Sequence, residues 1–222
     1  MKTLNKTLIC TALVGASALA LAPLANATPE LEVAIGSGGC STVKTTSNTG
    51  LVSWTGTDSS VHFTAITLDA TGVPISGPPD YLNSDTLDVH STGSGTLYLC
   101  VTETGLSGPI STHALSSFAS SELPRGWTVS ETTYADAADT AFGTADTLGT
   151  HAFTATGFAT SLSALSISGT FSLTEIYKIS ADSGGTTSDS IDIAETPEPA
   201  TLALLAVGLL GTAIGLRRRR RS

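Results

Sequence analysis

The feature that most limits the possible folds is a series of short apolar stretches separated by turn residues between residues 28 and 196. Stretches rich in Val, Ile, Thr and aromatic residues alternate with clusters of Gly, Pro, Asn and Asp, which is typical of strands joined by tight turns. No segment of this region repeats apolar residues at the spacing of a sustained amphipathic helix. The sequence therefore predicts an all-β fold, an antiparallel β-sandwich of about nine strands.

The expected strands are LEVAI (31–35), GLVSWTG (50–56), VHFTAITLDA (61–70), TLDVHS (86–91), TLYLCVTET (96–104), GWTVSETTY (126–134), HAFTATGFA (151–159), LSISGTFSLTEIYKIS (165–180) and DSIDIAE (189–195). In TLYLCVTET, the side chains of Leu97, Leu99 and Val101 point to one side, which we expect to be the core. In VHFTAITLDA the apolar phase shifts by one residue, which predicts a β-bulge near Ala65 and Ile66.

Two stretches fit the strand pattern less well. ADAADTAFGTADTLG (135–149) is rich in alanine but interrupted by glycine, so we expect a long excursion with one turn of helix. Glu175 interrupts the apolar side of the strand that carries Leu173 and Tyr177. A carboxylate there either reaches water at a sheet edge or belongs to a site, and the edge position is the favoured interpretation.

The N-terminal 27 residues have the features of a secretory signal peptide. A lysine-containing start precedes an apolar run at 8–21, and Ala25 and Ala27 form the small-x-small pattern that signal peptidase accepts. We therefore expect cleavage before Thr28. A retained membrane anchor is the alternative, but the apolar run is short for a span.

The body that remains, residues 28–196, is strongly acidic. It contains 18 Asp and Glu residues against Lys44, Arg125 and Lys178, which gives a net charge of −15. Nucleic-acid binding is not expected, because phosphate contacts need clustered Lys and Arg. Docking on anionic lipid is disfavoured for the same reason. An acidic surface favours solubility, and divalent cation binding is the less common explanation.

Cys40 and Cys100 are the two cysteines of the body. In an exported chain such a pair favours a disulfide, because the compartments outside the cytoplasm are oxidising. Two free buried thiols are the alternative. A zinc site is disfavoured, since neither cysteine has a second ligand at the usual spacing.

Candidate catalytic and metal-binding residues form no recognisable motif. The four histidines are far apart in sequence: His62, His90, His113 and His151. The aspartates of the stretch 135–149 lack the ligand spacing of a calcium-binding loop: Asp136, Asp139 and Asp146. The chain has no nucleophile elbow and no phosphate-binding glycine loop. The sequence thus predicts no enzyme, no metal site and no cofactor, while calcium between loops stays an alternative.

Trp54 and Trp127 allow two interpretations. They could form a stacking platform for sugar rings, but buried tryptophans are more common than exposed ones in sandwiches. A carbohydrate- or calcium-binding adhesion module is therefore an alternative function for the body.

The C-terminal segment has three features in a fixed order. Pro197, Glu198 and Pro199 form a stiff, extended tripeptide. Residues 200–216 carry no charge, and as a helix they would measure about 25 Å, at the lower limit for crossing a bilayer. The cluster that follows, Arg217, Arg218, Arg219, Arg220 and Arg221, is expected to stay on the cytoplasmic side.

This arrangement over residues 197–222 resembles the PEP-CTERM sorting signal of Gram-negative bacteria. The resemblance implies that an exosortase, a membrane peptidase, removes the helix at the inner membrane and passes the body to the cell surface or the extracellular space. It also implies an association with exopolysaccharide and biofilm, and it assigns no activity. The expected organisation is a signal peptide (1–27), an exported sandwich (28–196) and a sorting signal (197–222). A permanent anchor is the alternative role of the tail.

Overall fold

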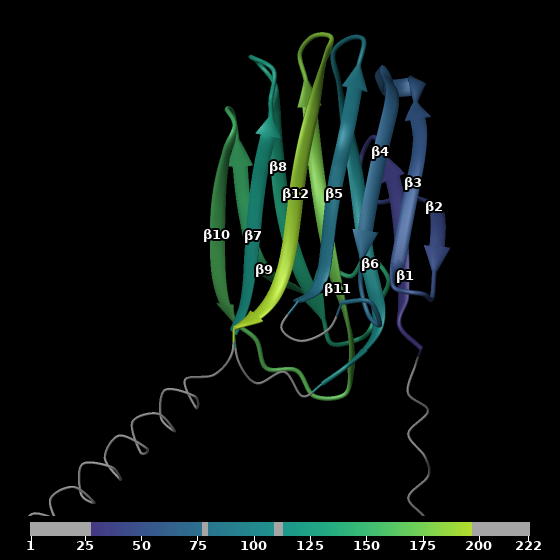
Figure 1. Ribbon diagram of the computed structural model, residues 1–222, viewed down its shortest axis with the longest axis vertical. Coiled ribbons are helices and arrows are strands. Elements are labelled where there is room, and N and C mark those ends of the chain that lie inside the picture. The colour runs from purple at the N-terminus through teal and green to yellow at the C-terminus, as the bar shows by residue number, and fades with distance from the viewer. Residues whose placement is uncertain (1–27, 77–79, 109–112, 197–222) are drawn as a thin grey trace, which may run out of the picture.

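The computed structural model describes residues 28–76, 80–108 and 113–196. Two six-stranded sheets, in which every pair of neighbouring strands is antiparallel, face each other in a sandwich (Figure 1). The predicted all-β fold is confirmed. The described residues form twelve strands instead of the expected nine.

Sheet A has the strand order β2 (Thr42–Ser47), β1 (Glu30–Gly36), β6 (Gly95–Ser107), β11 (Thr170–Ala181), β8 (Thr128–Asp136) and β9 (Asp146–Phe153). Sheet B has the order β10 (Gly157–Ala164), β7 (His113–Glu122), β12 (Gly185–Thr196), β5 (Asp80–Ser91), β4 (Phe63–Thr71) and β3 (Leu51–Asp58). A single turn of 3₁₀ helix, η1 (Ser59–Val61), joins β3 to β4. Strands far apart in sequence become neighbours, because β11 lies between β6 and β8, and β12 between β7 and β5.

The core lies between the two sheets and follows the alternation read from the sequence. Leu97, Leu99 and Val101 are fully buried, as predicted for β6. The largest core side chains come from both sheets and from the segment before β8: Trp127, Tyr177, Phe63, Phe118 and Phe171. Burial of one such aromatic side chain contributes about 1.5–3 kcal/mol, so this core is the main source of stability.

The predicted bulge and the predicted helical turn had different outcomes. The register of β4 against β5 shifts on both sides of Ala65, so the bulge is confirmed. The stretch 135–149 contains the end of β8, a loop and the start of β9. Two hydrogen-bonded turns, Asp139 N to Asp136 O and Gly143 N to Thr140 O, replace the expected turn of helix.

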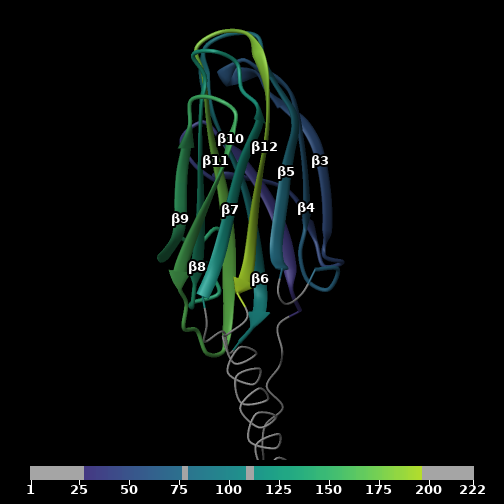
Figure 2. The same ribbon diagram turned by 60° about the vertical axis from the view of Figure 1, so that its left-hand side comes forward.

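The first and last strands of the sandwich begin and finish, respectively, at the same end of the molecule. β1 starts and β12 finishes at the lower end in Figures 1 and 2. The predicted signal peptide and the predicted membrane helix lie outside the described residues. Within residues 28–76, 80–108 and 113–196, no helix is long and apolar enough to cross a membrane.

Candidate functional site

The outer face of sheet A carries a groove of about 480 Å³. Its floor is formed by the outward side chains of β6, β11 and β8. The strand register places Tyr98, Lys178 and Ser130 in one row across these strands. Ile176 and Thr132 lie in the next row. The floor is thus a regular sheet surface with alternating ring, aliphatic and hydroxyl groups.

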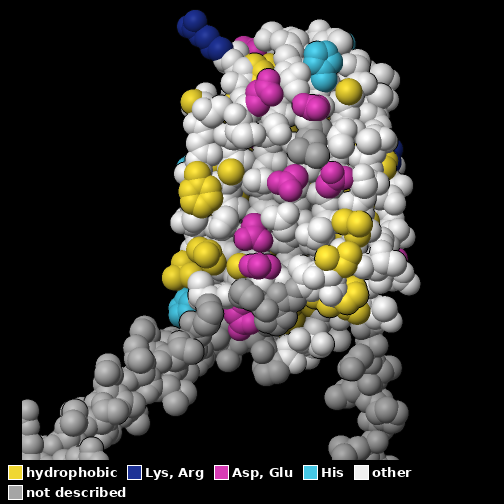
Figure 3. Space-filling model, viewed as in Figure 1, with side chains coloured by type: hydrophobic (Ala, Val, Ile, Leu, Met, Phe, Trp, Pro, Cys, Tyr) yellow, Lys and Arg dark blue, Asp and Glu magenta, His cyan; other side chains and the backbone are white. Residues whose placement is uncertain are grey.

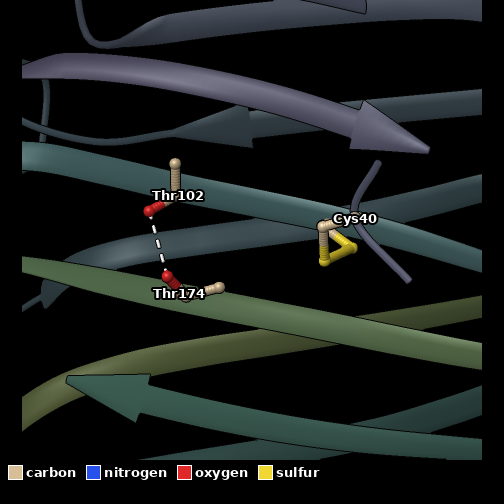
Figure 4. The surroundings of a disulfide bond; sticks show 4 residues. Cys40, Thr102 and Thr174 are labelled. Carbon is tan, nitrogen blue, oxygen red and sulfur yellow. Dashed lines mark hydrogen bonds between the residues drawn. A yellow bond between two sulfur atoms is a disulfide. The ribbon is translucent and has the colours of Figure 1, made fainter. Parts of the chain in front are cut away.

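A disulfide holds one wall of this groove. Cys40, in the connection between β1 and β2, is bonded to Cys100 on β6, with 5.7 Å between the Cα atoms (Figure 4). The predicted pairing is confirmed. Beside the disulfide, Thr102 and Thr174 form a hydrogen bond of 3.0 Å that links β6 to β11 (Figure 4). The connection carrying Gly39 and Cys40 is therefore fixed to the centre of the sheet.

The loop 137–145 between β8 and β9 forms the other wall. Its start is tied down where the Ala138 N–H donates to Asp136 Oδ1 at 2.8 Å. Asp139 Oδ1 accepts from the Gly105 N–H of β6 at 2.7 Å. The Ser172 hydroxyl of β11 donates to the Thr140 carbonyl at 2.8 Å. The loop is thus anchored to three strands.

Two residues of this loop have left-handed backbone conformations. Asp139 has φ 55° and Phe142 has φ 56°. Residues other than glycine seldom adopt such angles, and an aromatic residue there stores local strain. The anchored loop imposes this conformation and brings Phe142 and Thr144 to the groove.

The groove on sheet A and the outer face of sheet B differ in charge. Lys178 is the sole charged residue among the described residues that line the groove, and its Nζ lies 5.8 Å from the centre of the Tyr98 ring. On the outer face of sheet B, acidic side chains gather over β4, β5 and β12 (Figure 3). There Asp69 and Asp85 lie directly opposite each other, and Asp192 lies on the neighbouring strand.

Four carboxyl groups lie between the sheets. Glu103, Glu131 and Glu175 come from three adjacent strands of sheet A, and Asp189 comes from sheet B. Each of these side chains has at most 3% of its surface exposed. Because a buried carboxylate without a cation is costly, burial shifts each of these groups toward the neutral, protonated form.

Glu175 contradicts the expectation of an edge position. It lies in β11, a central strand of sheet A, and is completely buried. The Ser84 hydroxyl donates a hydrogen bond to Glu175 Oε2. Tyr177 donates to the Ser84 carbonyl at 2.7 Å and accepts from the Ile191 N–H at 2.9 Å. The sequence pattern could not reveal this network, since its partners come from the opposite sheet.

Burial dominates the pKa values of these groups. It raises the pKa of Glu175 well above the ordinary value, and the Ser84 hydrogen bond opposes this. Burial raises the pKa of Glu103 to about 8, although the Val73 N–H donates to Oε1 at 2.6 Å. Burial, with the charges of Asp189 and Glu175, raises the pKa of Glu131 to about 10. The pKa of Asp189 rises to about 6 by burial.

The four histidines have different local partners. His62 caps η1, His90 bonds to Thr186 at 3.1 Å, His113 begins β7, and His151 packs against Phe153. Within the described part of the chain, no three His, Cys, Asp or Glu side chains form a group that could hold a metal ion. Asp136 and Asp139 use carboxylate oxygens to hold the loop 137–145, and Asp146 lies exposed at the start of β9.

The tryptophans do not form an exposed platform together. Trp127 is 1% exposed, and its indole N–H donates to the Ser183 carbonyl at 3.1 Å. Trp54 packs partly buried against the core. The sugar-stacking interpretation of this pair is therefore wrong.

The sequence pattern did not indicate the aromatic residues of the groove. Tyr98, Tyr134 and Phe142 are distant in the chain, and only the strand order β6-β11-β8 brings the first two onto one face. The available signal was alternation, which placed Tyr98 opposite the core side of its strand.

The comparisons with known proteins concern the C-terminal end. Residues 195–220 match the family described as the PEP-CTERM protein-sorting motif. This range overlaps the predicted signal at 197–222 almost completely. A comparison with curated proteins found no match. The chain therefore carries a PEP-CTERM sorting motif, the signal for exosortase-targeted sorting of an exported protein.

Proposed function

We propose that the mature protein is a non-enzymatic structural protein of the cell surface or extracellular matrix. An exosortase cleaves its tail at the inner membrane after signal peptidase has removed residues 1–27. The observation that carries this proposal is the position of the sorting motif, which begins in the last two residues of β12. The motif thus follows a finished sandwich without an intervening domain.

The distribution of the core supports release of the body by cleavage. All buried hydrophobic residues of the described chain lie between Leu31 and Ile193. A cut at or after Pro197 therefore removes none of the core residues that the structure describes. The body can leave the membrane as a folded unit, because both sheets are complete without the tail.

The character of the body supports a structural role. A disulfide and a continuous core stabilise the sandwich. Within the described residues no three His, Cys, Asp or Glu side chains could hold a metal ion, and the carboxyl groups between the sheets are buried away from solvent, which supports a non-enzymatic protein. An association with exopolysaccharide in a biofilm is part of the same proposal.

Fractionation of cells that express tail variants tests the sorting step. Replacement of Pro197, Glu198 and Pro199 by alanine should leave the protein in the membrane fraction with its tail intact. The matched control changes Thr154 and Thr156, in the exposed turn before β10, to alanine and should be exported normally. Export of the triple-alanine protein with normal processing would contradict the proposal. Retention of the tail in the wild-type protein would show a permanent anchor instead.

A further inference from the structure

The groove on the outer face of sheet A has the construction of a binding site. Its two walls come from separate connections, one fixed by the Cys40–Cys100 disulfide and one by the anchored loop 137–145. Because both walls are already fixed without a ligand, binding would require little loss of conformational entropy. The left-handed backbone at Phe142 adds a second observation, since such strain is concentrated at functional sites.

The length of the aromatic surface fits a polymeric ligand better than a single small molecule. Tyr98 on β6 is paired with Lys178 on β11, which is paired in turn with Ser130 on β8. Tyr134 lies on the same strand as Ser130, four residues further along the chain. Standard strand spacings place the two tyrosine positions about 16 Å apart. A ligand that contacts both rings must extend diagonally over three strands.

The chemistry of the floor fits sugar rings. Aromatic faces at Tyr98, Tyr134 and Phe142 can cover the apolar faces of pyranose rings, while hydroxyl groups at Ser130 and Thr132 can bond to the ring substituents. A peptide strand is a poorer fit, because β6, β11 and β8 are paired on both sides and offer no free backbone edge. Nucleic acid is a poorer fit because the groove has one cation.

The charge of the groove selects among polysaccharides. The exposed ammonium of Lys178 is complementary to a carboxylate, and no acidic residue is among the described residues that line the groove. Asp69, Asp85 and Asp192 lie on the opposite outer face. Both sheets stand between these carboxylates and the groove, so they make no contact with a ligand bound there.

We propose that this groove binds a segment of acidic polysaccharide, with a uronate carboxylate at Lys178 and sugar rings on Tyr98 and Tyr134. This inference deepens the proposed surface function, since a polysaccharide is encountered outside the cell. Its test is independent of sorting, because the binding of the purified body does not depend on how the tail is processed.

Isothermal titration of the disulfide-bonded body, residues 28–196, with polygalacturonate oligomers tests the proposal. EDTA is included to remove divalent cations, and neutral dextran oligomers serve as the comparison ligand. The uronate oligomers should bind, and the dextran oligomers should bind at least tenfold more weakly. Absence of measurable uronate binding, or equal binding of both ligands, would overturn the proposal.

Variants assign the binding to the groove. Lys178→Met should remove the preference for uronate, and Tyr98→Leu or Tyr134→Leu should lower the affinity at least tenfold. The matched control is Phe158→Leu, which changes an aromatic residue that is 70% exposed on sheet B and should leave binding unchanged. Melting curves are recorded to check that each variant is folded, and Lys178→Met changes an exposed side chain. Unchanged binding in Lys178→Met and in both tyrosine variants would overturn the proposal.

Discussion

At the residue scale, Glu175 has an unusual environment for a carboxyl group. It is completely buried in a central strand, and the Ser84 hydroxyl donates to one of its carboxyl oxygens. Among the described residues, the other oxygen, Oε1, has no hydrogen-bond partner. A neutral carboxylic acid tolerates this position better than a carboxylate does, which is why burial raises its pKa.

Replacement of Glu175 by Gln tests whether this group is neutral. The amide has nearly the same shape, keeps an oxygen for the Ser84 hydroxyl and cannot ionise. Urea unfolding should show a smaller loss of unfolding free energy between pH 6 and pH 9 for Glu175→Gln than for the wild type. The control is Glu122→Gln, because Glu122 is exposed and should keep the wild-type pH dependence. Equal losses in wild type and Glu175→Gln would show that Glu175 is already ionised.

The disulfide provides a second prediction at this scale. It closes a loop with a sequence separation of 60 residues, and the loss of chain entropy in the unfolded state then stabilises the fold by about 4 kcal/mol. Reduction of the wild-type protein should therefore lower its melting temperature by well over 5 °C. The doubly substituted Cys40→Ala, Cys100→Ala protein should melt at the reduced temperature whether or not reductant is present. A melting temperature of the wild type that does not respond to reduction would contradict this account.

At the scale of elements, the strands in which large apolar residues alternate with polar ones were predictable from the sequence. The strands built from small polar residues were not. β6 and β12 were expected and are present with longer bounds. β2 (TVKTTS) was missed because, as an edge strand, it exposes side chains on both faces. β7 was missed because serines occupy half of its inward positions, at Ser116 and Ser120.

Pairing order explains the rest of what the sequence did not reveal. Alternation predicts which side chains share a face of one strand, but not which strands become neighbours. Glu175 could not be placed without knowing that β11 is central. The groove likewise depends on β11 lying between β6 and β8. The disulfide was predictable because two cysteines in an exported body leave one possible pair.

The end of β1 and the connection that follows it give a matched pair of glycine variants, at Gly36 and Gly38. A Cβ at Gly36 would overlap the Gly39 carbonyl and lie 2.5 Å from the Ser41 hydroxyl, whereas a Cβ at Gly38 would meet nothing within 4 Å. Gly36→Ala should destabilise the protein by about 1–3 kcal/mol through overpacking. Gly38→Ala should change stability by less than about 0.5 kcal/mol. Equal unfolding free energies for the two variants would mean that this wall is not held as described.

At the scale of the whole molecule, the buried carboxyl groups make stability depend on pH. In the unfolded chain a glutamate loses its proton near pH 4.5, whereas in the folded protein the pKa is about 8 for Glu103 and about 10 for Glu131. Above pH 4.5 the folded state therefore holds more protons than the unfolded state. Their contribution to stability is complete below that pH and is lost as the pH rises through the folded pKa values.

The expected result is a free energy of unfolding that falls steadily from pH 5 to pH 9. Each such group contributes a slope of up to about 1.4 kcal/mol per pH unit within its window. Urea titrations across this range measure the slope. A rise in stability toward alkaline pH would contradict the neutral state of the interior carboxyl groups.

We expect the sandwich to be exported and separated from its sorting motif. Intact mass spectrometry of the protein recovered from the cell surface and the medium tests it most directly. The expected species starts at Thr28, contains the Cys40–Cys100 disulfide and lacks Arg217–Arg221. A recovered protein whose mass still includes the five arginines would contradict it.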